Sequence, residues 1–120
     1  MARGTCAFSL PVEVDAQHRL VLSNSLVYGI VNLSKGSQVK VDVELFKAGS
    51  RGEVLTEEDA ATKTKVRKDF TLSQDGEVVS FACGESGIIR GNASILLRGS
   101  ARATASLHLI ELAASVEDCD

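Results

Sequence analysis

The sequence predicts an all-β fold, and three observations carry this prediction. From Gln38 onward, polar and apolar residues alternate, which places four apolar residues on one face: Val39, Val41, Val43 and Leu45. Shorter stretches with the same period recur at about ten-residue spacing, each bounded by Gly, Ser, Asn or Asp. Proline occurs once, at Pro11, and no flexible linker divides the 120 residues. One β-sandwich or barrel domain is therefore expected rather than a parallel α/β sheet.

The two-residue period predicts about seven strands in chain order. They are Phe8–Val14, Leu20–Leu22, Gln38–Leu45, Val66–Leu72, Glu77–Cys83, Ser94–Arg98 and Ala103–Leu112.

Two further segments are ambiguous. Asn24–Leu33 places its apolar residues at helical spacing, but Gly29 and three β-branched residues disfavour a helix there. Glu57–Thr64 could form a helical turn capped by Thr56, and we interpret it as a solvated loop between strands.

The expected core is aliphatic, because the chain has four Phe, one Tyr and no Trp. The predicted core positions are Val39, Val41, Val43, Leu45, Phe70, Leu72, Val79, Phe81, Leu107 and Leu109. Such a core is thin for a free-standing sandwich. We therefore expect one face to be buried in an oligomer.

Charge and hydropathy exclude several function classes. The 13 basic and 16 acidic residues give a net charge of −3, which argues against a nucleic-acid or anionic-membrane footprint over the whole domain, so no direct nucleic-acid binding and no membrane binding are expected. No apolar run approaches the ~18–20 residues that span a bilayer, and the N-terminal residues do not resemble a secretory signal. An intracellular protein is expected, in which Cys6, Cys83 and Cys119 are reduced thiols and Cys119 is exposed.

The sequence offers little for catalysis or for a cofactor. His18 and His108 lie far apart without a third candidate metal ligand, and the glycines form neither a Walker motif nor another phosphate loop. We therefore predict a non-enzyme with no metal and no cofactor. The candidate partner-binding residues are acidic, and they fall in two groups: Glu57, Glu58 and Asp59, followed by the basic stretch Lys63–Lys68, and Glu117, Asp118 and Asp120 near the C-terminus.

Two segments resemble the nucleoplasmin-like domain, particularly the versions in plant nucleolar histone-deacetylase-like proteins and nuclear FK-binding prolyl isomerases. The first is Leu20-Val21-Leu22-Ser23-Asn24-Ser25-Leu26, followed by the Lys35-Gly36 turn and the alternating strand after it. The second is Lys68-Asp69-Phe70-Thr71-Leu72-Ser73 with Val78-Val79-Ser80-Phe81-Ala82-Cys83-Gly84, which resembles the family's late hairpin. The resemblance covers residues 6–84; in an alternative register the closing hairpin lies at residues 95–109.

This resemblance implies an eight-stranded jelly-roll β-sandwich that assembles into a pentameric ring or a decamer of two rings. It also implies a nuclear, nucleolar binding module that acts as a chaperone for basic proteins such as histones or ribosomal proteins, with contacts through its acidic loops and tail. Residues 1–114 would form the domain, and residues 115–120 would be an acidic extension.

Two alternatives stay open. Val14–Leu22 and Leu33–Val39 also resemble the swapped-hairpin DNA-binding regulators of bacteria, in which a short helix lies between two strands. The segment Ser25–Val31 contains no Lys or Arg for phosphate contacts, however. A jelly-roll coat subunit of a virus or phage would share the β-rich, oligomeric character.

Overall fold

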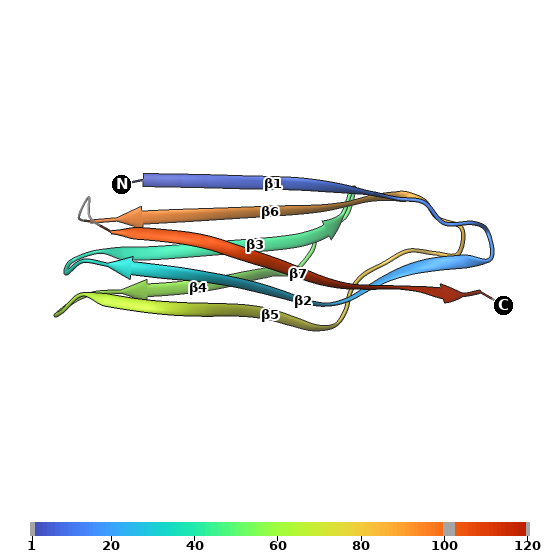
Figure 1. Cartoon of the computed structure of the whole chain (residues 1–120). Helices are drawn as coiled ribbons and strands as arrows, with labels where there is room; N and C mark the ends of the chain where they lie inside the picture. Colours follow the sequence, from blue (N-terminus) through green and yellow to red (C-terminus); the bar gives the residue numbers. More distant parts are fainter. Residues whose placement is uncertain (1, 100–102, 120) are drawn as a thin grey trace.

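The computed structural model describes residues 2–99 and 103–119, and these residues form a two-layered β-sandwich (Figure 1). The molecule is elongated, with principal extents of 59 × 21 × 18 Å. Its seven strands are β1 (Ala2–Val12), β2 (His18–Leu33), β3 (Gln38–Lys47), β4 (Val54–Ala60), β5 (Val66–Ser80), β6 (Gly87–Arg98) and β7 (Thr104–Asp118). The all-β prediction is confirmed. The described residues contain no helix, and hence none that is long and apolar enough to span a membrane.

The strands form two antiparallel sheets rather than one closed barrel. The larger sheet has the order β1-β6-β3-β4, and the smaller has the order β5-β2-β7. The first six strands pair in a nested way: β1 with β6, β2 with β5 and β3 with β4. The seventh strand, β7, adds to the free edge of β2.

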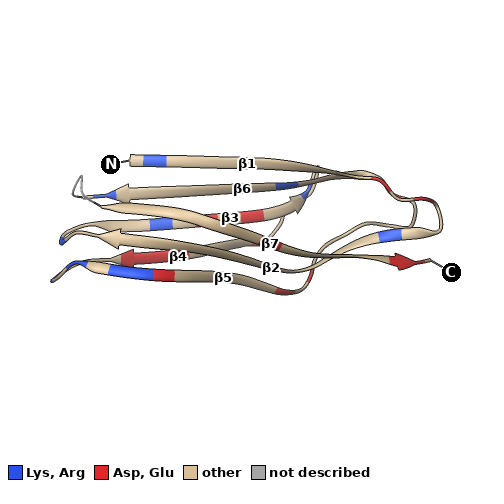
Figure 2. Cartoon of the chain, viewed as in Figure 1, with Lys and Arg blue, Asp and Glu red and all other residues tan. Residues whose placement is uncertain are grey.

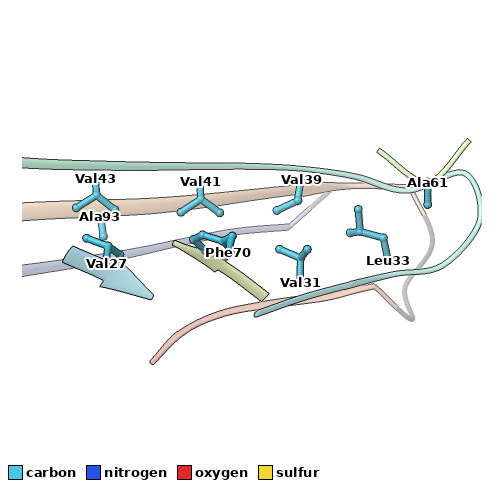
Figure 3. Close-up of a cluster of buried hydrophobic side chains, with 9 residues drawn as sticks. All are labelled: Val27, Val31, Leu33, Val39, Val41, Val43, Ala61, Phe70 and Ala93. Carbon is cyan, nitrogen blue, oxygen red and sulfur yellow. The ribbon is translucent and has the colours of Figure 1, made fainter. Parts of the chain in front are cut away.

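The buried side chains lie between the sheets in two clusters. The larger contains Val27, Val31, Leu33, Val39, Val41, Val43, Ala61, Phe70 and Ala93 (Figure 3). The smaller contains Val12, Leu22, Val79, Phe81 and Ile89. Seven of the ten predicted core residues are buried, and Leu72 and Leu107 are partly buried.

Leu109 was wrongly predicted as core, because it is 47% exposed. The pairing of β7 with β2 shifts between Leu107 and Leu109, so that His108 is an extra residue in β7. A bulge of this kind reverses which side chains face inward beyond it. Ile110 packs against the core in place of Leu109.

Two long strands replace shorter predicted elements. The predicted strands Val66–Leu72 and Glu77–Cys83 belong largely to one strand, β5, and the ambiguous segment Asn24–Leu33 continues β2. At the join, Asn24 adopts a left-handed conformation (φ 59°), as does Gly76 on β5 (φ 81°), and the Asn24 side-chain oxygen accepts a hydrogen bond from the Gly76 amide at 3.0 Å. Asn24 and Gly76, whose residue types are typical of turns, therefore form a bulge within paired strands.

The prediction that all three cysteines are free thiols is wrong for two of them. Cys83 and Cys119 form a disulfide, with their Cα atoms 6.2 Å apart, and Cys119 is only partly exposed. The bond joins the segment after β5 to the end of β7, and the Cys119 amide also donates a hydrogen bond to the Gln17 carbonyl at 2.7 Å. Cys6 remains a free, exposed thiol on β1.

Candidate binding surfaces

The first predicted acidic group, Glu57, Glu58 and Asp59, lies on strand β4 and not in a solvated loop. β4 pairs with β3 from Val54 to Ala60, so the loop prediction is wrong for residues 57–60, whereas residues 61–64 do lie in the loop between β4 and β5. The polar composition of this segment concealed it, because β4 is an edge strand whose half-buried positions include the charged residues Glu57 and Asp59. The acidic residues therefore have fixed positions rather than the mobility of a loop.

Lys68 engages two members of this group. Its Nζ lies 3.2 Å from a Glu57 carboxylate oxygen and 3.0 Å from Asp59 Oδ1. The hydrogen bond to Asp59 and then that to Glu57 raise the pKa of Lys68. The two carboxylates are 19% and 13% exposed, whereas Glu58 on the opposite face is 67% exposed. Of the three acids, Glu58 is thus the one most available to a partner.

The second predicted acidic group extends strand β7. Residues 115–118 belong to this strand, so it crosses the predicted domain boundary at residue 114. Glu117 accepts two hydrogen bonds from the Arg19 guanidinium, at 2.7 and 3.0 Å. Asp118 Oδ1 lies 3.0 Å from His18 Nε2 and is 90% exposed. Asp120 lies outside the described residues.

His18 joins this end of the molecule to the turn before β2. Its Nδ1 lies 2.6 Å from Asp15 Oδ1, and this hydrogen bond, with the Asp118 charge, raises the pKa of His18. The same contact lowers the pKa of Asp15. Together with the Cys83–Cys119 disulfide, the contacts of His18 with Asp15 and Asp118 hold the turn before β2 close to the end of β7.

A third surface, which the sequence interpretation missed, is the inner face of β1. Cross-strand partners share a face of a sheet, and Leu10 is opposite the buried Ile89, so the even-numbered residues of β1 face the interior side. These residues are all apolar or small: Ala2, Gly4, Cys6, Phe8, Leu10 and Val12. Only Val12 is buried, whereas Leu10 is 44% exposed.

The reason for this exposure is the unequal strand number of the two sheets. The larger sheet has four strands and the smaller has three, so β1 lies along one long side of the molecule beyond β7 (Figure 1). A groove of about 540 Å³ separates the two strands, lined by Gly4, Thr5, Cys6, Ala93, Ile95, Leu107, His108, Leu109 and Ile110. We call this surface the β1–β7 groove. The alternation from Ala2 to Val12 was a signal that could have predicted it.

The two histidines have different surroundings. The His108 ring shares a hydrogen bond with the Ser106 hydroxyl at 2.8 Å and lies near the Tyr28 ring. Among residues 2–99 and 103–119, no group of three or more His, Cys, Asp or Glu could hold a metal ion. Comparison of the sequence with protein-family models and with curated proteins finds no match.

Proposed function

We propose that this protein is a self-assembling β-sandwich module that binds basic proteins, in the manner of a nucleoplasmin-like chaperone of histones or ribosomal proteins. The observation that carries the proposal is the β1–β7 groove. An apolar strand face left uncovered along much of a strand is typical of a surface that is buried on association. A further copy of the chain is the occupant that we propose, in a ring of five or in two such rings.

The finer fold assignment is also part of the proposal. In a jelly roll, the first strand pairs with the last, the second with the next to last, and so on inward. The nested pairs β1–β6, β2–β5 and β3–β4 follow this rule with one hairpin fewer than the eight-stranded form. In contrast, the chain forms strand β2 where the swapped-hairpin regulators have a short helix, so nothing here favours that alternative.

Glu58 and Asp118 are the acidic residues that we propose as the main contacts to a basic partner. They are the most exposed of the described candidates, and their ion-pair partners lie 3.9 and 3.0 Å away. In a ring, several copies of each carboxylate would face one partner, and avidity would compensate for weak single contacts. Raising the salt concentration should release a histone from the ring while the apolar contacts between copies persist.

Two variants of adjacent residues test the assembly interface. Leu10→Asp places a charge on the inner face of β1, whereas Ser9→Asp places the same charge on the outer face of β1, opposite Arg90. Because Leu10 is already 44% exposed in the single chain, both variants should fold with unchanged circular dichroism. The proposal requires that Leu10→Asp abolish assembly in light scattering and that Ser9→Asp leave it intact. Equal behaviour of the two variants would remove the inner face of β1 from the interface.

The cellular compartment of the protein can be tested through the redox state of Cys83 and Cys119. A nuclear and nucleolar location follows from the resemblance, but thiols are kept reduced in the nucleus and cytosol. The Cys83–Cys119 disulfide forms readily only under oxidising conditions. Alkylation of free thiols in freshly lysed cells, followed by mass spectrometry, would find both cysteines alkylated if the protein is nuclear and both protected if it is exported.

A further inference from the structure

Positive charge is concentrated at one end of the molecule, with the acidic residues Glu58 and Asp59 of β4 beside it. Four segments meet there: residues 2–4, 33–38, 60–67 and 96–99. Together they contain six basic residues and no Asp or Glu: Arg3, Lys35, Lys63, Lys65, Arg67 and Arg98. Figure 2 shows this concentration of Lys and Arg at the end opposite the C-terminus. We call these six residues the basic end.

The strand pairing brings the four segments together. The Gly36 amide donates to the Ala61 carbonyl at 2.6 Å, and the Ala61 amide donates to the Ser37 carbonyl at 2.9 Å, so the turn before β3 lies against the loop before β5. Arg98 on β6 pairs with Gln38 on β3, and β1 begins beside the end of β6. Residues that are distant in sequence therefore form one continuous surface.

The six side chains are available to a partner. All six residues are exposed, and among the described residues none of them forms an ion pair or a side-chain hydrogen bond. Lys68 and Lys40, by comparison, already face carboxylates on β4. The opposite end carries Glu13, Asp15, Glu117 and Asp118 against Arg19 and His18, so the net charge of −3 conceals a charge separation along the 59 Å axis.

The composition of the basic end favours a phosphate backbone over a protein partner. Its segments contain no aromatic residue, and none of the large exposed hydrophobic residues lies on them. Protein interfaces usually need such anchors, and single-stranded nucleic acids need aromatic platforms for stacking. The polar neighbours are the hydroxyls of Ser34, Thr62 and Thr64, which are groups that contact phosphates in protein–DNA complexes.

We propose that the basic end binds the phosphate backbone of a nucleic-acid duplex without reading its sequence. The cross-section of the molecule is 21 × 18 Å, and about six phosphates of each strand of a duplex lie within such a width. Six cations can therefore contact at most about six of these phosphates. This contact uses the end of the molecule opposite Asp118, so it can occur together with the binding of a basic protein at Asp118, whereas Glu58 lies beside the basic end.

Salt dependence gives the first test, with a fluorescein-labelled 20-base-pair DNA duplex as the probe and anisotropy as the readout. About six phosphate contacts predict a slope of about −5 in a plot of log affinity against log salt, a loss of about a thousandfold between 50 and 200 mM salt. A duplex of unrelated sequence should bind equally well. The absence of binding at 20 mM salt, or a preference for one sequence, would overturn the proposal.

A matched pair of double variants locates the contact. Lys63→Gln/Lys65→Gln removes two charges from the basic end, and Arg51→Gln/Arg90→Gln removes two exposed charges elsewhere, so both have the same net charge. The first should reduce the magnitude of the salt slope by about 2, whereas the second should leave it unchanged. Equal effects of the two double variants on the salt slope would rule out a nucleic-acid site at this end. Displacement of the duplex by poly-L-glutamate at the same charge concentration would also rule it out.

Discussion

Replacing Cys83 and Cys119 with serine should lower the free energy of unfolding by about 4 kcal/mol. The disulfide closes a loop across a sequence separation of 36 residues. A cross-link of that span removes about 13 cal/mol/K of chain entropy from the unfolded state, which corresponds to about 4 kcal/mol at 25 °C. Since domains of this size are stable by only 5–15 kcal/mol, the double variant should lose a large part of its stability.

Equilibrium urea denaturation at one fixed protein concentration, followed by circular dichroism, measures this difference. Cys6→Ser is the matched control, because Cys6 is a free, exposed thiol whose loss should change the midpoint very little. Adding a reductant to the wild-type protein should reproduce the effect of the double variant. A loss below 1 kcal/mol, or an equal effect of Cys6→Ser, would refute the assignment of the disulfide as a stabilising cross-link.

Three further substitutions have defined outcomes. Val41→Asp places an unpaired charge at a fully buried position and should prevent folding, and a soluble variant with the native circular dichroism spectrum would contradict the core assignment. Lys68→Met leaves two half-buried carboxylates on β4 unpaired and should lower stability by about 1 kcal/mol, whereas Lys40→Met, which loses only an exposed 3.9 Å pair, should have almost no effect in thermal unfolding. Asp15 raises the pKa of His18 above its ordinary value of 6.5, so the stabilisation by His18 is complete below about pH 6.5 and is lost as the pH rises through the folded-state pKa. The stability cost of His18→Gln should therefore be larger at about pH 5.5 than at about pH 8.5, and equal costs would contradict the ion pairs.

The sequence predicted the regular strands well because their alternation is a local property. β3 is the clearest case, since its four inward-facing residues are all buried as expected. The errors come from residues whose local conformational preference is overridden by the pairing of strands. Asn24 and Gly76 are typical turn residues, but here they form bulges inside long strands, because β2 is paired on both sides.

Other features depend on contacts between distant segments, which the sequence pattern does not contain. Cys83 and Cys119 are separated by strands β6 and β7, and only the fold brings them together. The acidic residues of β4 look like a solvated loop until Lys68 is seen beside them. The basic end is likewise invisible in a net charge of −3, because the charges are sorted by the topology and not by the order of the sequence.

The absolute mass in solution, measured by light scattering after size exclusion at low and at high salt, tests the proposed self-assembly most directly. A ring of five has a mass of about 64 kDa, five times the 12.7 kDa of one chain, and two rings have twice that mass. The account predicts one of these values at both salt concentrations, because the contacts between copies are apolar. A monomer of 12.7 kDa under both conditions would contradict it.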